Sequence, residues 1–254
     1  MPAVVVRNLV KRYGSVKALD GVSFEVNEGR IFAFLGPNGA GKTTTVKILT
    51  GIIPKDNGEI EILGVKDPYP SREIEIKRKI GFSPEEPNIY PYLKGHEFLS
   101  FVLDLFGRPG WMAERMEELL HAFGVDYLDK MIKDMSHGMK QKLVLVSVLM
   151  REPDLIFLDE PIVGLDAKSA KVLKMYLRKL ADSGKTIFMN THVLEVAERV
   201  ADEVGIINEG KMVAVGRVDE LRKRLGMEGT LEDLFLKLTG QEEEVRRIVE
   251  ELGA

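Results

Sequence analysis

The sequence predicts an α/β fold in which a glycine-rich loop joins a buried strand to a helix, with a small antiparallel sheet beside it and a helical insertion. Three observations predict this fold. An apolar run at residues 31–35 precedes a turn with three glycines, and a helix opens at Lys42. Segments with alternating apolar residues are typical of half-buried strands. Between Pro84 and Met135, apolar residues recur instead at helical spacing.

The composition indicates a globular protein without unusual features. The chain has 254 residues, of which 44% are hydrophobic, enough to bury one large core or two smaller ones. Its net charge of -4 gives no reason to expect a nucleic-acid partner, and the absence of cysteine fits a reducing compartment. No apolar run approaches the roughly 20 residues that a membrane span needs. We therefore expect a soluble, cytoplasmic chain that binds no nucleic acid.

The glycine-rich segment fits the phosphate-binding pattern G-x-x-x-x-G-K-[ST]. Glycines let the backbone wrap a polyphosphate so that consecutive N–H groups point inward at the start of a helix. Lys42 would place its charge between the β- and γ-phosphates, and the Thr43 hydroxyl can bind Mg²⁺. An ordinary surface turn is the alternative, but the flanking strand and helix favour a nucleoside triphosphate site. Its residues are Gly36, Pro37, Asn38, Gly39, Ala40, Gly41, Lys42, Thr43 and Thr44.

Three further strands predict the small antiparallel sheet. They are residues 4–6, residues 22–26 and residues 59–63, the last after an Asp-Asn-Gly turn. Tyr13 lies between the first two. Its ring would stack on a nucleotide base or simply cover a hairpin, and the sequence favours neither alternative.

The segment from Pro84 to about Met135 predicts a helical insertion between the two halves of the nucleotide core. Apolar residues recur there at helical spacing, broken by turns that contain proline and glycine. Tyr90 and Tyr92 lie in a loop flanked by prolines, where they are hard to bury. They therefore fit a partner-binding surface.

A second anion site is predicted at residues 135–139. Ser136 is a good N-cap for a helix that runs to about Met150. Its hydroxyl and the exposed amide of Gly138 could bind an anion at the helix start, although an ordinary capped helix is the alternative.

Two acids end the next apolar strand, residues 155–158. Asp159 could support bound Mg²⁺, and Glu160 could polarise a water molecule. Asp166 then caps a long helix, and the strand at residues 186–190 leads to His192. Two more strands, residues 204–207 and 211–215, precede a helical tail.

With these motifs in this order, the chain resembles the nucleotide-binding subunit of ABC (ATP-binding cassette) transporters over nearly its whole length. The resemblance implies a RecA-like P-loop NTPase core with a small antiparallel β subdomain and an inserted α-helical subdomain. The core would take residues 1–83 and 151–216, the helical subdomain residues 84–150, and the C-terminal helical tail residues 217–254.

The resemblance also gives each site residue a role. Tyr13 becomes the base-stacking aromatic, and Lys42 and Thr43 bind phosphate and Mg²⁺. Ser136 and Gly138 become the contacts of the signature segment, residues 135–139. Asp159 supports Mg²⁺, Glu160 is the base, Asp166 is the D-loop acid, and His192 senses the γ-phosphate.

Two positions depart from the family pattern. Glu85 replaces the usual loop glutamine, and the signature Leu-Ser-Gly-Gly-Gln reads Met-Ser-His-Gly-Met. Glu85 keeps an oxygen for Mg²⁺ or water, but it loses an amide donor and adds negative charge near a triphosphate. The combination of residues 84–87 with residues 136–139 is most similar to the ABC-2 type exporter branch.

The resemblance implies an ATPase whose cofactors are ATP and Mg²⁺. Two chains would sandwich two ATP molecules head to tail, because hydrolysis also needs charge stabilisation from the signature of a second subunit. ATP binding would close this dimer, and hydrolysis would release it. Both movements would reach a membrane permease through the helical insertion and the loop around Glu85, Tyr90 and Tyr92. The chain would then lie on the cytoplasmic face of the membrane, and the permease would choose the cargo.

Two alternatives come from other functional classes. One is a soluble ABC-type ATPase that acts on a macromolecular complex such as the ribosome or DNA. However, ribosomal members usually carry two cassettes, and DNA-repair members carry a long coiled-coil insertion. The other is a phosphate-loop kinase, which leaves the signature segment and His192 unexplained.

Overall fold

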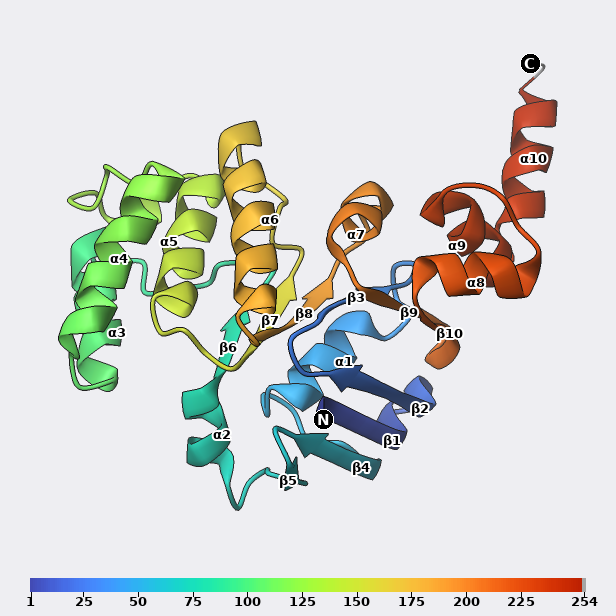
Figure 1. Ribbon diagram of the computed structural model, residues 1–254, viewed down its shortest axis with the longest axis horizontal. Coiled ribbons are helices and arrows are strands. Elements are labelled where there is room, and N and C mark those ends of the chain that lie inside the picture. Colours follow the sequence, from blue (N-terminus) through green and yellow to red (C-terminus); the bar gives the residue numbers. More distant parts are fainter. Residues whose placement is uncertain (253–254) are drawn as a thin grey trace.

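The computed structural model describes residues 1–252, without the side chains of residues 244–246 and 249, and it contains two sheets (Figure 1). The smaller sheet is antiparallel, as predicted, in the order β2-β1-β4-β5. Its strands are β1 (Pro2–Tyr13), β2 (Val16–Asn27), β4 (Asn57–Ile62) and β5 (Val65–Lys66).

The larger sheet has the order β10-β9-β3-β8-β7-β6, and only β10 runs antiparallel to its neighbour. The carboxyl ends of the five parallel strands therefore meet at one edge, where ligands bind in open α/β sheets. Its strands are β3 (Ile31–Leu35), β6 (Ile80–Ser83), β7 (Leu155–Asp159), β8 (Thr186–Asn190), β9 (Glu203–Asn208) and β10 (Lys211–Gly216).

The central strands β3, β7 and β8 of the larger sheet are buried along their whole length, which explains why they are nearly continuous apolar runs. In β3, Ile31, Ala33 and Leu35 face the core shared with the helices. Phe32 and Phe34 point the other way, toward the antiparallel sheet. There Phe24 of β2 lies within 5.7 Å of Phe32, centroid to centroid, so an aromatic cluster joins the two sheets.

The helices surround this framework. Figure 1 shows α3, α4 and α5 on the side of the molecule opposite α8, α9 and α10. The helices are α1 (Lys42–Leu49), α2 (Glu73–Lys79), α3 (Gly95–Leu105), α4 (Gly110–Phe123), the 3-10 turn η1 (Ile132–Asp134), α5 (His137–Leu149), α6 (Ala167–Asp182), α7 (Leu194–Val200), α8 (Val218–Leu225), α9 (Leu231–Thr239) and α10 (Glu242–Glu251).

The structure confirms the predicted α/β class and differs from the prediction in detail. Tyr13 is the last residue of β1, which continues well beyond residues 4–6, rather than lying between two strands. Elements β5, α2 and β6 were not predicted. Within residues 1–252, no helix combines the length and the apolar character that crossing a membrane requires.

Candidate functional site

A pocket of about 570 Å³ opens at the carboxyl edge of the larger sheet. It brings together the phosphate-binding loop, the loop after β6, the ends of β7 and β8, and the C-terminal helices. Its lining residues are Ala18, Gly36, Pro37, Asn38, Gly39, Gly41, Lys42, Thr43, Thr44, Glu85, Asp159, Glu160, Asn190, Thr191, His192, Leu194, Phe235 and Gln241.

Two glycines of the loop cannot be replaced without moving their neighbours. Gly41 has a φ of +106°, and a Cβ there would lie 2.6 Å from the Ala18 carbonyl oxygen. A Cβ on Gly36 would lie 2.4 Å from the Ile207 carbonyl oxygen. The loop is therefore pressed against β2 and β9, which fixes its amides at the start of α1.

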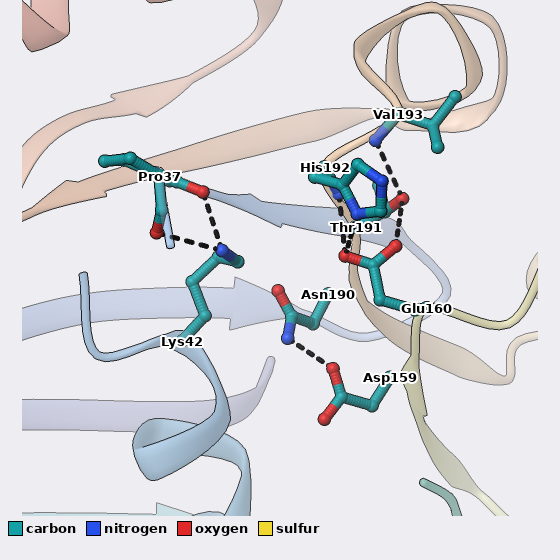
Figure 2. A network of polar contacts seen from close by, with 9 residues as sticks. Pro37, Lys42, Asp159, Glu160, Asn190, Thr191, His192 and Val193 are labelled. Atoms are coloured by element: carbon teal, nitrogen blue, oxygen red, sulfur yellow. Dashed lines mark hydrogen bonds and ion pairs between the residues drawn. The ribbon is translucent and has the colours of Figure 1, made fainter. Parts of the chain in front are cut away.

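Lys42 is buried beneath the loop it belongs to. Its Nζ donates to the carbonyl oxygens of Gly36 at 2.6 Å and Pro37 at 3.2 Å (Figure 2). Burial lowers the pKa of Lys42, and the nearby carboxylates of Glu160, Asp159 and Glu85 oppose that shift. A polyphosphate would give this ammonium group a stronger partner than two neutral carbonyls.

Glu160 is held by the segment that follows β8. Thr191 Oγ1 donates to Glu160 Oε2 at 3.0 Å, and the backbone N–H of His192 donates to Oε1 at 2.9 Å. His192 Nδ1 lies 2.7 Å from the same Oε1. Figure 2 shows this group beside Asp159 and Asn190, facing Lys42 across the site. The side chain of Glu160 is almost fully buried, so its carboxylate has one orientation.

Asp159 lies beside Glu160 at the end of β7. Burial raises the pKa of Asp159 to about 6, although Asn190 Nδ2 donates a hydrogen bond to its Oδ1. The negative charges of Glu85 and Glu160 contribute to this raised pKa. A cation near Asp159 would stabilise the ionised form.

The oxygens at this place fit Mg²⁺. Asn190 Oδ1 is buried and accepts no hydrogen bond from any residue that the structure describes. Thr43 lines the same pocket. Within residues 1–252, no three acidic or imidazole side chains gather closely enough to hold a metal alone. The carboxylate of Asp159 and the hydroxyl of Thr43 suit Mg²⁺, which usually takes one or two carboxylates and completes its shell with phosphate oxygens and water.

The residues predicted for the signature and the D-loop lie outside this lining. Ser136 caps α5, accepting a hydrogen bond from Met139 N at 3.3 Å. A Cβ on Gly138 would lie 2.3 Å from the Gly164 carbonyl oxygen, so α5 begins directly against the loop that follows β7. Asp166 caps α6 through Ser169 and lies 2.6 Å from Lys142 Nζ of α5.

Two other predicted residues also stay outside the lining, whereas Glu85 is part of it. Tyr13 is 50% exposed, with Lys11 Nζ 5.7 Å from its ring centroid. Ala40 is buried within the loop, where its N–H donates to the Pro37 carbonyl oxygen at 3.2 Å.

The structure also adds residues that the sequence reasoning missed. Asn190 ends β8 and Thr191 follows it, beside the two acids, and polar residues at the end of a buried parallel strand could have signalled this. Phe235 and Gln241 come from the C-terminal helices. No motif marks them, and only the folded chain brings them to the pocket.

The chain is similar to proteins of known family. The family profile described as "ABC transporter" matches residues 19–163. The linearmycin resistance ATP-binding protein of Bacillus subtilis is 36% identical over 86% of this chain and 70% of the relative. The Nod factor export ATP-binding protein I of Burkholderia orbicola is 38% identical over 83% of this chain and 69% of the relative.

The fold is similar to that of solved cassettes. A dimeric ATP-binding cassette in a post-hydrolysis state, bound to ADP and phosphate, superposes with a TM-score of 0.76. It is 25% identical and covers 85% of this chain and 98% of its own. The similarity confirms the predicted RecA-like P-loop core.

Proposed function

We propose that this chain, which belongs to the ABC transporter family, is the ATP-hydrolysing subunit of an exporter and works as a head-to-tail dimer. The family and the fold make it an ABC ATPase. What we propose beyond this is the direction of transport, the dimer and the roles of single residues.

The arrangement around Glu160 carries the proposal. Its carboxylate is buried, oriented by Thr191 and His192, and shares a pocket with Lys42 and the phosphate loop. A carboxylate fixed opposite a phosphate site can orient a water molecule and accept its proton. His192 would contact the γ-phosphate while it holds Glu160.

The remaining residues of the pocket would bind the nucleotide. The amides of residues 36–44 and Lys42 would hold the phosphates, and Tyr13, on the edge of the antiparallel sheet, would stack on the base. Thr43, Asp159 and Glu85 would hold Mg²⁺ directly or through water. When bound, Mg²⁺ would neutralise charge that develops on the phosphate oxygens.

A second copy would complete the site. Ser136 caps α5 and Gly138 lies in its first turn, yet both lie outside the pocket of their own chain. In a head-to-tail dimer they would cover the γ-phosphate of the partner and exclude water. The dimeric structure of a similar cassette supports this arrangement.

Export through a membrane permease is supported by the relatives and by the surface. One relative is named for Nod factor export. Tyr90 and Tyr92 are 55% and 76% exposed on the loop that follows Glu85, where a permease could contact aromatic side chains. The chain would then act at the cytoplasmic face of the membrane, bound to its permease.

The variant Glu160→Gln tests this assignment. Glutamine keeps the shape and can still accept hydrogen bonds, but it cannot take a proton from water. We expect a Kd for ATP close to the parent value in Mg²⁺, and a kcat lower by about 100-fold or more. The control Glu195→Gln, an exposed acid at the start of α7, should hydrolyse ATP like the parent. Hydrolysis by Glu160→Gln at the parent rate would remove Glu160 from this role.

A further inference from the structure

Helix α9 and the residue that follows its cap form part of the wall of the nucleotide pocket. Phe235, on α9, and Gln241, just after it, line the same space as Pro37 and His192. These two residues come from a segment to which none of the motifs above gives a role. Figure 1 shows α9 close to α7 and to the edge of the larger sheet that ends in β10.

The fold holds α9 in this position firmly. Leu231, Leu234 and Phe235 are buried in the core shared with the helices. In addition, Asn208 Nδ2 donates to the Thr239 carbonyl oxygen at 3.4 Å. Asn208 ends β9, which pairs with β3, the strand that leads into the phosphate loop. The end of α9 is therefore anchored beside that loop.

The cap of α9 then places Gln241. Gly240 has a φ of +72°, its N–H donates to the Lys237 carbonyl oxygen at 3.2 Å, and Gln241 N donates to the Leu236 carbonyl oxygen at 2.9 Å. This pair of bonds is the pattern of a Schellman cap, which needs glycine at the left-handed position. The cap thus fixes the backbone of Gln241 beside the pocket that this residue lines.

The side-chain amide of Gln241 suits a phosphate ligand. Its NH₂ group offers two donors without adding charge to a pocket already lined by three carboxylates, Glu85, Asp159 and Glu160. Among the residues that the structure describes, no hydrogen bond involves this amide, so it is available to a ligand.

We propose that Gln241 donates a hydrogen bond to a phosphate oxygen of the bound nucleotide. Gln241 thereby becomes a further positioning residue of the site. Because α10 begins at the next residue, nucleotide binding also fixes the junction between α9 and α10. This inference rests on the proposed function, since it requires the triphosphate in this pocket.

Binding measurements on Gln241→Ala and Gln241→Glu test the proposal. ATP and inorganic tripolyphosphate would each displace a fluorescent ATP analogue from the full chain in Mg²⁺. Loss of one hydrogen bond should raise the Kd of both ligands about two- to tenfold for Gln241→Ala. Gln241→Glu should weaken binding more, because it adds a fourth carboxylate facing the phosphates. The control Glu232→Ala, an exposed acid on α9, should bind like the parent.

Three results would overturn the proposal. They are parent-like affinity in both variants, weaker binding of ATP but not of tripolyphosphate, and weaker binding only in variants whose melting temperature without nucleotide has also fallen. A second readout is amide hydrogen exchange, which should slow at residues 236–241 on ATP binding in the parent but not in Gln241→Ala.

The same experiment separates this inference from the proposed function. If the parent fails to bind ATP, or if Lys42→Ala binds it equally well, the nucleotide site itself is wrong. If the parent binds ATP, Lys42→Ala does not, and the Gln241 variants bind like the parent, only the role of Gln241 is wrong.

Discussion

At the scale of the residue, the backbone of Glu160 helps to set the direction of its carboxylate. Its φ is +47°, a left-handed conformation that costs a residue other than glycine about 1–3 kcal/mol. Two backbone bonds hold it there: Glu160 N donates to the Asn190 carbonyl oxygen at 2.9 Å, and Val163 N donates to the Glu160 carbonyl oxygen at 3.2 Å. The turn aims the carboxylate at Thr191 and His192 instead of continuing the strand.

Glu85 gives a prediction about nucleotide affinity. Its carboxylate lines the pocket and would repel a triphosphate, so we expect Glu85→Gln to bind ATP several-fold more tightly than the parent when EDTA removes Mg²⁺. With Mg²⁺ present, the difference in ATP affinity between Glu85→Gln and the parent should become smaller, because the cation compensates for the carboxylate of Glu85. Calorimetric titrations with and without Mg²⁺ would measure both affinities. The control is Glu86→Gln, a change at the exposed neighbour outside the pocket, which should bind ATP like the parent. Equal affinities of the parent and Glu85→Gln for ATP without Mg²⁺ would contradict this interpretation.

Local motifs made some of these residues predictable and left others hidden. Lys42 follows a glycine pattern within a few positions, so the sequence alone points to it. Thr191 contacts Glu160 from 31 positions away, and Gln241 reaches the loop only because α9 docks beside β9. Such contacts depend on tertiary packing, which no short pattern records.

At the scale of the element, the start of α5 is joined to the loop that follows β7. The His137 ring lies over Gly164, where a Cβ would come within 2.6 Å of its Cδ2. Lys142 of α5 pairs with Asp166, the cap of α6. The segment that would bind the phosphate of a partner is thus packed against the loop next to Glu160.

The ion pair between Lys142 and Asp166 gives a prediction about pH. The hydrogen bond from Lys142, with those from Ser169, holds the pKa of Asp166 well below its usual range. A carboxyl group whose pKa is lowered by folding adds stability above its unfolded pKa, near 4, and loses it as the pH falls toward the folded value. Asp166→Asn keeps the helix cap but loses the charge.

We therefore expect Asp166→Asn to have a lower melting temperature than the parent at neutral pH, with a difference that shrinks only below about pH 4. Asp166→Ala should be less stable still, because it also loses the cap. Thermal unfolding followed by circular dichroism would show both effects. Glu117→Gln, a change at an exposed acid on α4, should match the parent throughout. A melting temperature for Asp166→Asn equal to that of the parent at neutral pH would argue against the ion pair.

Elements with a clear apolar pattern were predictable, and elements without one were not. Helices α3 and α4 repeat apolar residues over several turns, so their existence followed from the sequence. Strand β6 has four residues, and its Gly81 has no side chain to show a pattern because Val148 and Pro153 occupy that space. Without β6, the sequence could not show that Glu85 follows a strand next to β7.

At the scale of the whole molecule, the chain separates the two segments that we propose bind phosphate. The phosphate loop and Glu160 share one pocket, whereas Ser136 lies outside it at the start of α5. Under the proposed function, a second copy would supply the segment at Ser136 that the pocket of a single chain lacks. The residues alone predict a second anion site at Ser136 and Gly138, and only the family resemblance implies that it serves a second chain.

Sedimentation velocity of Glu160→Gln tests this central claim most directly. With ATP and Mg²⁺, the unhydrolysed nucleotide should hold two chains together, and the variant should sediment as a dimer that returns to monomer in ADP. The double variant Glu160→Gln with Ser136→Asp should stay monomeric, because aspartate keeps the helix cap but repels the γ-phosphate of the partner. A Glu160→Gln chain that is monomeric with ATP bound, or a double variant that still dimerises, would contradict the account.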